Sequence, residues 1–564
     1  MISGSAIATL VLFIISIFFV IVPVSIPLRR FGFPLNLPIN LSTAPIIAIA
    51  VLWAAQCIGA TQIRDGIVGT DGIKPYNILI LFMSLAYMAI TLDVTGILQA
   101  AAFWVSNRGG SNGWKLYFYF YVMLTLLSVI LGNDPIILSG TVFLVYYTQA
   151  LGLDPLAWLI AEFAAANTAS MVLFVGNPTN VVICEGFRIN NVAFSAYTIF
   201  PFLACNVLCF GALAFQFRSQ KYIPRRLDRK GDLDPKSVLK DPVSARVGGI
   251  LLGSCLAVAL VVSFFNVDVW KIMLPFAVAK FIFDITWDHW RYSRGIIGHR
   301  DEKGAVEEGS DEEEIVRQME RVGTMKSPHL SSPRNRQSTL PTTSSESELP
   351  PTLVNSAVLP TSNKDTLSKE SSSPTTPTKP TPLASQRSKL HALHLHLTHH
   401  FPTFFKALPR LPFALVPFAF SQFILIESLA HQGWIEIFAG WLVRAGHRAI
   451  YPTVWLIGIL GVVLCNLAGT NIGATIFLTK IMRAAALPPD TARAGAIALA
   501  VASNIGAVSF TFSASLAGLL WRGILEQKGI TIRQREFALW NMLPILVMTV
   551  VGLAIVCAEM AVLY

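Results

Sequence analysis

The stretch LGNDPIILSG, residues 131–140, lies between two very apolar runs, LYFYFYVMLTLLSVI before it and TVFLVYYTQA after it. Proline removes a backbone donor and clashes with the preceding helical turn, so a helix cannot run undisturbed through Asn133, Asp134 and Pro135. Irregular backbone at membrane depth is tolerated where it lines a protein cavity. We therefore interpret 116–150 as a re-entrant hairpin with its tip at 132–135.

The composition of the whole chain supports a membrane setting. Of its 564 residues, 53% are hydrophobic and 13% are charged, and long apolar runs recur from end to end. Spanning helices need about 20 apolar residues, whereas barrel strands give short alternating segments. The sequence therefore predicts an all-α polytopic membrane protein whose first run, from Ser5, is an uncleaved span. The seven cysteines are predicted to be buried small hydrophobes, because none has metal-type spacing.

The positive charge is concentrated in loops that flank the apolar runs. The formal net charge is +10, and the most basic loop is 219–246. Positively charged loops face the cytosol, so we place this loop in the cytosol and both termini in the extracellular or lumenal space. The expected location is multi-pass in the plasma membrane or an endomembrane, with the lipid bilayer as a partner and no nucleic acid.

Residues 287–402 differ from the rest in composition, being rich in Ser, Thr, Pro and charge. Such a segment cannot bury a core and is predicted to be a disordered cytosolic linker, a candidate for binding kinases or cytosolic regulators. Its end, HALHLHLTHH at 391–400, is interpreted as a polar juxtamembrane stretch in preference to a metal site.

Removing the linker leaves two halves with the same order of features. ITLDVTG, LGNDPIIL and LFVGNPTNVV in the first half correspond to ILIES, LCNLAGTNIGATI and FTFSASLAGLLW in the second. We predict two inverted repeats, each of about five spans plus a re-entrant helical hairpin and a broken helix. The expected parts are the first repeat 1–218, the basic loop 219–246, the first two spans of the second repeat 247–286, the linker 287–402 and the remainder 403–564.

The breaks supply the candidate binding residues, because amide and hydroxyl groups can hold an ion without the cost of a permanent charge. Close packing of small and polar residues between helices is the alternative role for any single break. The candidates are Asn133, Asp134, Asn177, Thr179, Asn180, Asn466, Thr470, Asn471, Ser513 and Ser515.

Carboxylates in apolar surroundings are candidates for moving a proton or holding a cation. Asp134 is interpreted as a cation or proton ligand, with a cap at the hairpin tip or exposure to an aqueous vestibule as alternatives. Asp93, Glu162 and Glu427 form a candidate proton relay. For Glu162, pairing with a neighbouring helix is an equal alternative.

At these residues the chain resembles the ion transporter superfamily, which includes arsenite-efflux pumps, sodium/proton antiporters, citrate carriers and divalent anion/sodium symporters. GNDPIILSGTVFLV and CNLAGTNIGATI are similar to the hairpins of the arsenite and citrate branch, and ANTASMVLFVGNPTNVVI and SASLAGLLW to its broken spans. The resemblance implies a transport domain that moves against a scaffold domain, elevator fashion, often in a homodimer. The symporter branch has Ser-Asn-Thr at each tip, where this chain has Gly-Asn-Asp and Cys-Asn-Leu.

These features predict a secondary active transporter of a small anion, inorganic or carboxylate, or of a metalloid oxyacid. We expect a proton or sodium ion as the coupling ion, and no metal site or other cofactor. Arsenite or silicic acid efflux is the alternative within this class. From other classes, an anion channel or a non-transporting membrane sensor remains open, whereas no HExxH or Ser-His-Asp pattern of an enzyme occurs in the apolar segments.

Overall fold

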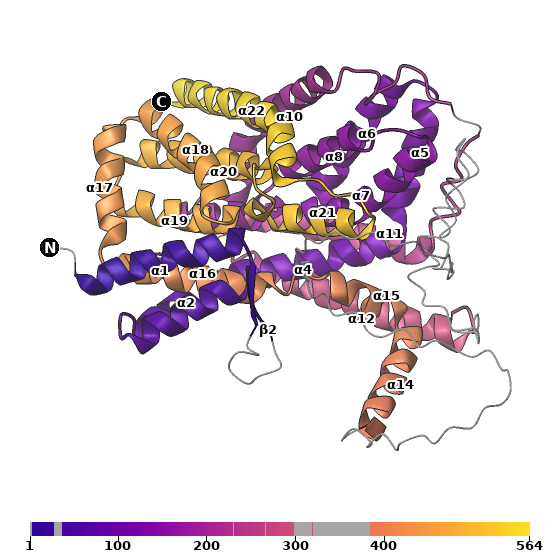
Figure 1. The fold of residues 1–564 in the computed structure, drawn as a ribbon, viewed down its shortest axis with the longest axis horizontal. Helices are drawn as coiled ribbons and strands as arrows, with labels where there is room; N and C mark the ends of the chain where they lie inside the picture. The colour runs from indigo at the N-terminus through magenta and orange to yellow at the C-terminus, as the bar shows by residue number, and fades with distance from the viewer. Residues whose placement is uncertain (1–2, 28–35, 229–230, 266, 298–318, 320–383) are drawn as a thin grey trace, which may run out of the picture. The chain divides into compact units, whose positions relative to one another are not determined.

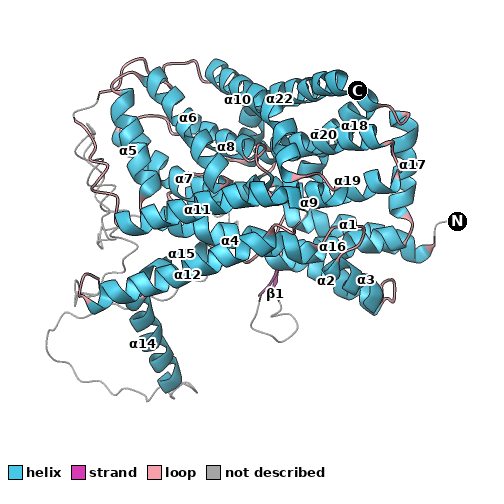
Figure 2. Ribbon diagram, turned by 180° about the vertical axis from the view of Figure 1, so that it is seen from behind, coloured by secondary structure: helices cyan, strands magenta, loops and turns pink. Residues whose placement is uncertain are grey.

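The computed structural model describes the chain outside residues 1–2, 28–35, 229–230, 266, 298–318 and 320–383 (Figure 1). The described residues are helical apart from loops and one antiparallel hairpin, β1 (Val24–Pro27) and β2 (Asn36–Ile39) (Figure 2). Nine of the helical segments in this part are long and apolar enough to cross a membrane. The predicted all-helical multi-pass membrane fold is confirmed.

In the described part of the chain, ten helices precede the basic loop. They are α1 (Gly4–Ile21), α2 (Thr43–Ala54), α3 (Ala60–Val68), α4 (Pro75–Val94), α5 (Ile97–Gly109), α6 (Gly113–Leu131), α7 (Asn133–Ala150), α8 (Leu156–Ala169), α9 (Pro178–Phe187) and α10 (Asn191–Gln216).

The later helices begin after that loop. They are α11 (Pro242–Val262), α12 (Trp270–Ser293), α14 (Ala384–His400), α15 (Pro402–Ala407), α16 (Leu415–His431), α17 (Trp434–Gly446), α18 (Ile450–Leu467), α19 (Asn471–Ala484), α20 (Pro489–Val508), α21 (Leu516–Gln527) and α22 (Gln534–Leu563), with 3-10 turns η3 (Ser263–Phe265) and η4 (Leu408–Arg410).

Helical continuity is interrupted at four places between these helices. Gly132, with φ +84°, separates α6 from α7, and Gly469, with φ +80°, lies between α18 and α19. The other two interruptions are extended stretches around one 3-10 turn each: η2 (Phe174–Gly176) between α8 and α9, and η5 (Phe512–Ala514) between α20 and α21. We call these four places the first to fourth breaks in chain order.

Helices from distant parts of the sequence pack on one another around the breaks. α10 packs along α22, and α18 along α20, as both views show (Figures 1 and 2). α7 packs on α21 and α9 on α19, so the helix after each break contacts one from the other half of the chain. This packing brings the breaks of the two halves into one region of the core.

The contacts divide the chain into one unit of residues 1–326 and 397–564 and a second of residues 327–396. The interior of the linker expected over 287–402 lies outside the described residues, but its two edges are helical, in α12 and α14. The linker bounds of 287–402 stay a prediction, with α12 and α14 extending into its two edges. At the first edge, Asp288 accepts hydrogen bonds from Thr403 N (2.8 Å) and Thr403 Oγ1 (3.0 Å). Arg291 forms an ion pair with Asp241 at 2.8 Å. These contacts stabilise α12 beyond Trp287.

Alanine substitutions at Gly132 and Gly469 should separate backbone strain from packing at the first and third breaks. Both glycines have positive φ, where a side chain costs roughly 1–3 kcal/mol. A Cβ at Gly469 would lie 2.8 Å from Val20 Cγ1, whereas one at Gly132 meets nothing within 4 Å. We expect Gly469→Ala to lower the thermal unfolding temperature of the detergent-purified protein more than Gly132→Ala. Equal shifts would contradict the packing of α1 on the third break.

Candidate functional site at the helix breaks

The first break places two predicted residues at the start of a helix. Asn133 and Asp134 are half-buried residues in the first turn of α7. Asn133 Nδ2 donates a hydrogen bond to Asn167 Oδ1 of α8 at 3.3 Å. Pro135 lies in this same first turn, where its missing N–H would have no helical partner in any case. The break is therefore at Gly132, and the tip is tied to the last turn of α8.

The second break is closed by its own asparagines. Asn180 Nδ2 donates to the carbonyl oxygens of Ser170 (2.8 Å) and Leu173 (2.9 Å). Asn177 caps α9 by accepting from Thr179 N at 3.2 Å. The backbone carbonyl groups that lack helical partners after the end of α8 are thus hydrogen-bonded in a region without water.

The third and fourth breaks are linked in a similar way. Asn466, in the last turn of α18, accepts hydrogen bonds at Oδ1 from the backbone N–H groups of Phe510 (2.7 Å) and Thr511 (3.2 Å). Thr470 caps α19 and Ser515 caps α21, each by accepting from the N–H of a residue three positions on, at 3.2 and 3.1 Å. The side chain of Asn466 thereby holds the fourth break beside the end of α18.

Asn504 of α20 joins the two halves and was not predicted. Its Nδ2 donates to Asn180 Oδ1 at 2.8 Å, and its Oδ1 accepts from Asn177 Nδ2 at 3.3 Å. Next to it, Ser503 Oγ donates to Thr179 Oγ1 at 3.3 Å. The second break therefore contacts α20 within two turns of the fourth. The signal that could have revealed Asn504 is the polar pair within the apolar stretch ALAVASNIGAV.

Direct contacts therefore join only some of the ten candidate residues. Within the described residues, no hydrogen bond joins Asp134, Asn471 or Ser513 to another candidate, and the Ser513 hydroxyl is buried without a partner. All ten candidates lie at a break or within about one helical turn of one.

Four helices, α7, α9, α19 and α21, begin at the breaks. A helix start carries a partial positive charge and directs N–H groups outward, which attracts anions. The ends of α6, α8, α18 and α20 meet at the same breaks and present carbonyl oxygens, which suit cations. The arrangement can hold a small oxygen-rich solute together with a cation.

Two carboxylates of the predicted relay contact α7. Asp93 accepts a hydrogen bond from Ser139 Oγ and pairs with Arg410 at 3.3 Å. Glu162, fully buried on α8, accepts from Thr141 Oγ1 at 3.0 Å. Ser139 and Thr141 are two residues apart and lie on different sides of α7, so the two carboxylates flank this helix.

The third carboxylate, Glu427, belongs to a separate cluster. It pairs with Lys480 of α19 at 2.9 Å and accepts from Thr70 Oγ1 at 2.8 Å. Lys480 also pairs with Asp71 at 2.9 Å. Burial tends to raise the pKa of Asp71, but the hydrogen bond and charge of Lys480 outweigh it and hold the pKa below its usual value. Glu427 thus joins α16 to α19.

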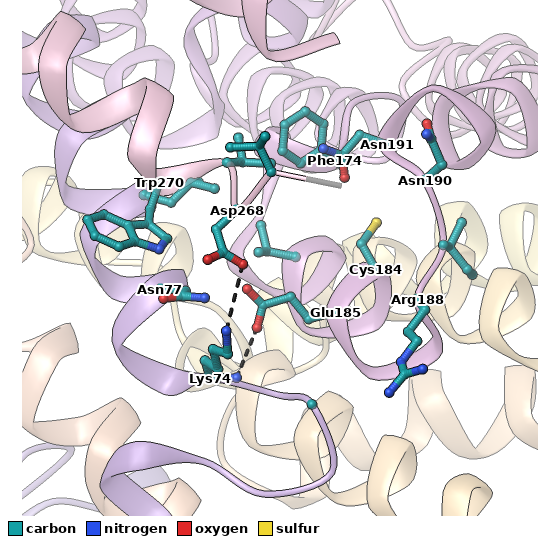
Figure 3. Close-up of a pocket in the computed structure, with 16 residues that line it drawn as sticks. Lys74, Asn77, Phe174, Cys184, Glu185, Arg188, Asn190, Asn191, Asp268 and Trp270 are labelled. Carbon is teal, nitrogen blue, oxygen red and sulfur yellow. Dashed lines mark hydrogen bonds and ion pairs between the residues drawn. The ribbon is translucent and has the colours of Figure 1, made fainter. Parts of the chain in front are cut away.

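A cavity of about 290 Å³ borders the second break (Figure 3). Phe174 of η2 lines it, together with the start of α4, the end of α9, the start of α10 and the loop before α12. Glu185 accepts from the Lys74 backbone N–H at 3.0 Å, and the Lys74 ammonium lies 3.8 Å from Asp268. Charged groups of both signs therefore surround an approach to the second break.

α12, predicted as an apolar span, carries a buried charged stripe that was not predicted. Lys280, Asp284 and Asp288 are 0%, 1% and 0% exposed and lie four residues apart, hence on one face. Lys280 pairs with Asp284, which accepts from Tyr87 OH of α4 at 3.0 Å. Charges at this spacing within an apolar run were the available signal.

The chain is similar in sequence to known membrane transporters. The sequence profile of the citrate transporter family matches residues 4–291. The arsenical pump membrane proteins of Yersinia enterocolitica and Escherichia coli K12 are 27% and 26% identical over 228 residues, 39% of this chain. The match spans about half (52%) of each of these relatives. The solved YdaH transporter of Alcanivorax borkumensis aligns over 99% of this chain and 98% of its own, with 11% identity and a TM-score of 0.45.

Removing the buried Lys280 charge should destabilise the protein strongly. Lys280→Met leaves Asp284 as an unpaired buried charge, at a cost of roughly 3–5 kcal/mol, and the double variant Lys280→Met/Asp284→Leu should recover part of it. Lys271→Met is the control on the same helix, because its ion pair with Asp268 is exposed, and it should change stability by less than about 0.5 kcal/mol. Thermal unfolding measures all three, and a double variant no more stable than the single one would contradict the pairing.

Proposed function

Because the chain belongs to the citrate transporter family, and is a transporter and not an enzyme, we propose that it carries a small anion, inorganic or carboxylate, or a metalloid oxyacid, driven by a proton or sodium gradient. The observation that carries the proposal is the set of four helix starts at the breaks. These starts favour an anion or an oxygen-rich acid, and the neighbouring helix ends favour a coupling cation.

Two inverted repeats account for the breaks. Gly96 and Gly433 have φ +85° and +79° and precede α5 and α17, and Gly132 and Gly469 precede α7 and α19. Both pairs are 337 positions apart (433 minus 96 and 469 minus 132). This supports repeats over 1–218 and 247–563 with the linker inserted in the second.

The glycine pairs also change which tip residues correspond. The motifs LGNDPIIL and LCNLAGTNIGATI place Asn133 opposite Asn466 when their first asparagines are matched, but the shared glycine offset aligns Asn133 with Thr470 and Asp134 with Asn471. The first tip then carries an acid where the second carries an amide. Asp134 is accordingly the proposed ligand for the coupling ion, and the remaining candidates at the breaks are proposed to surround the solute.

Reciprocal packing supports an elevator-type movement. α7 packs on α21 and α9 on α19, while α4 contacts α7 and α16 contacts α19. The helices at the breaks would move as one transport domain, and α4 and α16 would belong to the scaffold. Asp93 and Glu427 are then contacts between scaffold and transport domain, where a titratable group can couple protonation to movement. The proposed orientation places loop 219–246 and the linker in the cytosol.

Arsenite or silicic acid efflux is the second candidate, because several relatives are named arsenical pump membrane proteins. An anion channel or a sensor of the same fold is the remaining alternative. Saturable flux that depends on a counter-ion gradient distinguishes a transporter from both.

Flux into liposomes that contain the purified protein tests the proposal. Citrate, succinate, phosphate, sulfate, chloride, arsenite and silicic acid are offered with sodium or potassium at two pH values. We expect saturable uptake or exchange of one class. Asn177→Ala should raise the half-saturation concentration by about tenfold, because a buried hydrogen-bonding group is lost. Asp134→Asn should abolish the dependence on the gradient.

Two control variants are matched to these substitutions. Asn112 caps α6 by accepting from Lys115 N at 3.0 Å, as Asn177 caps α9, but it lies away from the breaks. Asp490 is an exposed acid in the first turn of α20. Asn112→Ala and Asp490→Asn should keep the flux of the unmodified protein. Flux that does not saturate and ignores every gradient would support a channel instead.

A further inference from the structure

Gln422 of α16 is a buried polar residue that the candidate site does not include. Its side chain is 1% exposed, and neither its amide oxygen nor its amide nitrogen has a hydrogen-bond partner within the described residues. Burying an amide with both groups unpaired is costly, and native proteins rarely leave such groups without a partner or a role.

The side chain points at the third break. A Cβ built on Gly473 would lie 3.3 Å from Gln422 Oε1, 3.5 Å from Thr470 Oγ1 and 3.6 Å from the Ala468 carbonyl oxygen. Gly473 is in the first turn of α19, so its missing side chain leaves room for the amide to reach the helix start. Gln422 therefore stands beside the α19 N-terminus.

An ion pair holds the two helices in this arrangement. Glu427, five residues after Gln422 on α16, pairs with Lys480, seven residues after Gly473 on α19, at 2.9 Å. The Glu427–Lys480 pair follows the Gln422–Gly473 pair along both helices. α16 and α19 therefore run in the same direction across this interface. In this conformation the Glu427–Lys480 ion pair is thus a second contact between the two helices that carry Gln422 and Gly473.

We propose that Gln422 is a substrate-binding residue that selects solutes carrying an O–H group. Its Nε2 donates to a solute oxygen held at the α19 N-terminus, and its Oε1 accepts from a hydroxyl of the same solute. The ligand class is a small hydroxy acid or an oxyacid with at least one O–H. A bare cation would satisfy only Oε1 and leave Nε2 unpaired. The inference rests on the proposed function and names the chemistry of its substrate.

The experiment compares solutes that differ by one hydroxyl group. Citrate is paired with tricarballylate and malate with succinate, and phosphate and arsenite are included as oxyacids, all in the liposome assay. The unmodified protein should prefer the hydroxylated member of each pair that it carries. Gln422→Leu should raise the half-saturation concentration of the preferred solute by about tenfold and remove the preference.

Gln432→Leu is the matched control, because it is the same substitution at the residue that directly follows α16. Gln432 donates to the Cys57 carbonyl oxygen at 3.0 Å and accepts from Ser5 Oγ at 3.2 Å, away from the breaks. It should keep the preference of the unmodified protein for the hydroxylated solute. Gln422→Glu has nearly the shape of glutamine and, assayed at a pH where the new carboxyl is ionised, exchanges the donor for an acceptor, so it should weaken binding even if Gln422→Leu does not fold.

Each outcome has a distinct meaning. If Gln422→Leu or Gln422→Glu keeps the preference and affinity of the unmodified protein while Asn177→Ala binds the solute more weakly, the role of Gln422 is overturned. The proposed function then still stands. If Gln422→Glu lowers the sodium or magnesium concentration needed for half-maximal flux, the role of Gln422 in solute selection is overturned in favour of a cation ligand. No saturable flux of any solute by the folded unmodified protein overturns both proposals.

Discussion

The structure depends on supplying partners for backbone groups where membrane helices stop. At the second break, one side chain, Asn180, satisfies two carbonyl groups, and Asn466 satisfies two N–H groups of the fourth break. Without water, each unsatisfied group would carry its full desolvation penalty. The asparagines therefore stabilise the breaks, and the same polarity makes the region suitable for an oxygen-rich solute. If the proposed function holds, stability and binding draw on one set of groups.

Asn504 extends this principle between the two halves of the chain. By bonding both Asn177 and Asn180, it makes the geometry of the second break depend on α20, more than 300 residues away in sequence. The breaks are consequently not four independent loops. We expect a change at the second break to disturb α20 through these buried amides.

Sequence patterns predicted the multi-pass helical fold and all four breaks, because Gly, Pro and Asn grouped inside an apolar run disfavour a continuous helix. The structure adds detail: within the predicted 132–135 the break is at Gly132, with Pro135 in the first turn of α7, and Asn466 lies in the last turn of α18. Asn504 and Gln422 were not predicted because the groups they face belong to helices distant in sequence. Lys280 was missed although its spacing from Asp284 is visible in the sequence, and only the contact of Asp284 with Tyr87 of α4 requires the fold. Pairings of this kind are set by tertiary packing, which local patterns do not encode.

The buried stripe on α12 has a consequence for how the protein is made. α12 is not among the nine helical segments apolar enough to enter a bilayer by composition, in the described part of the chain. An uncompensated Lys or Asp at a helix centre costs about 2.5–3.5 kcal/mol during insertion. Lys280 and Asp284 offset each other, and Tyr87 belongs to α4, which is synthesised earlier. We therefore expect the integration of α12 at the translocon to depend on α4, which supplies Tyr87 to the buried pair.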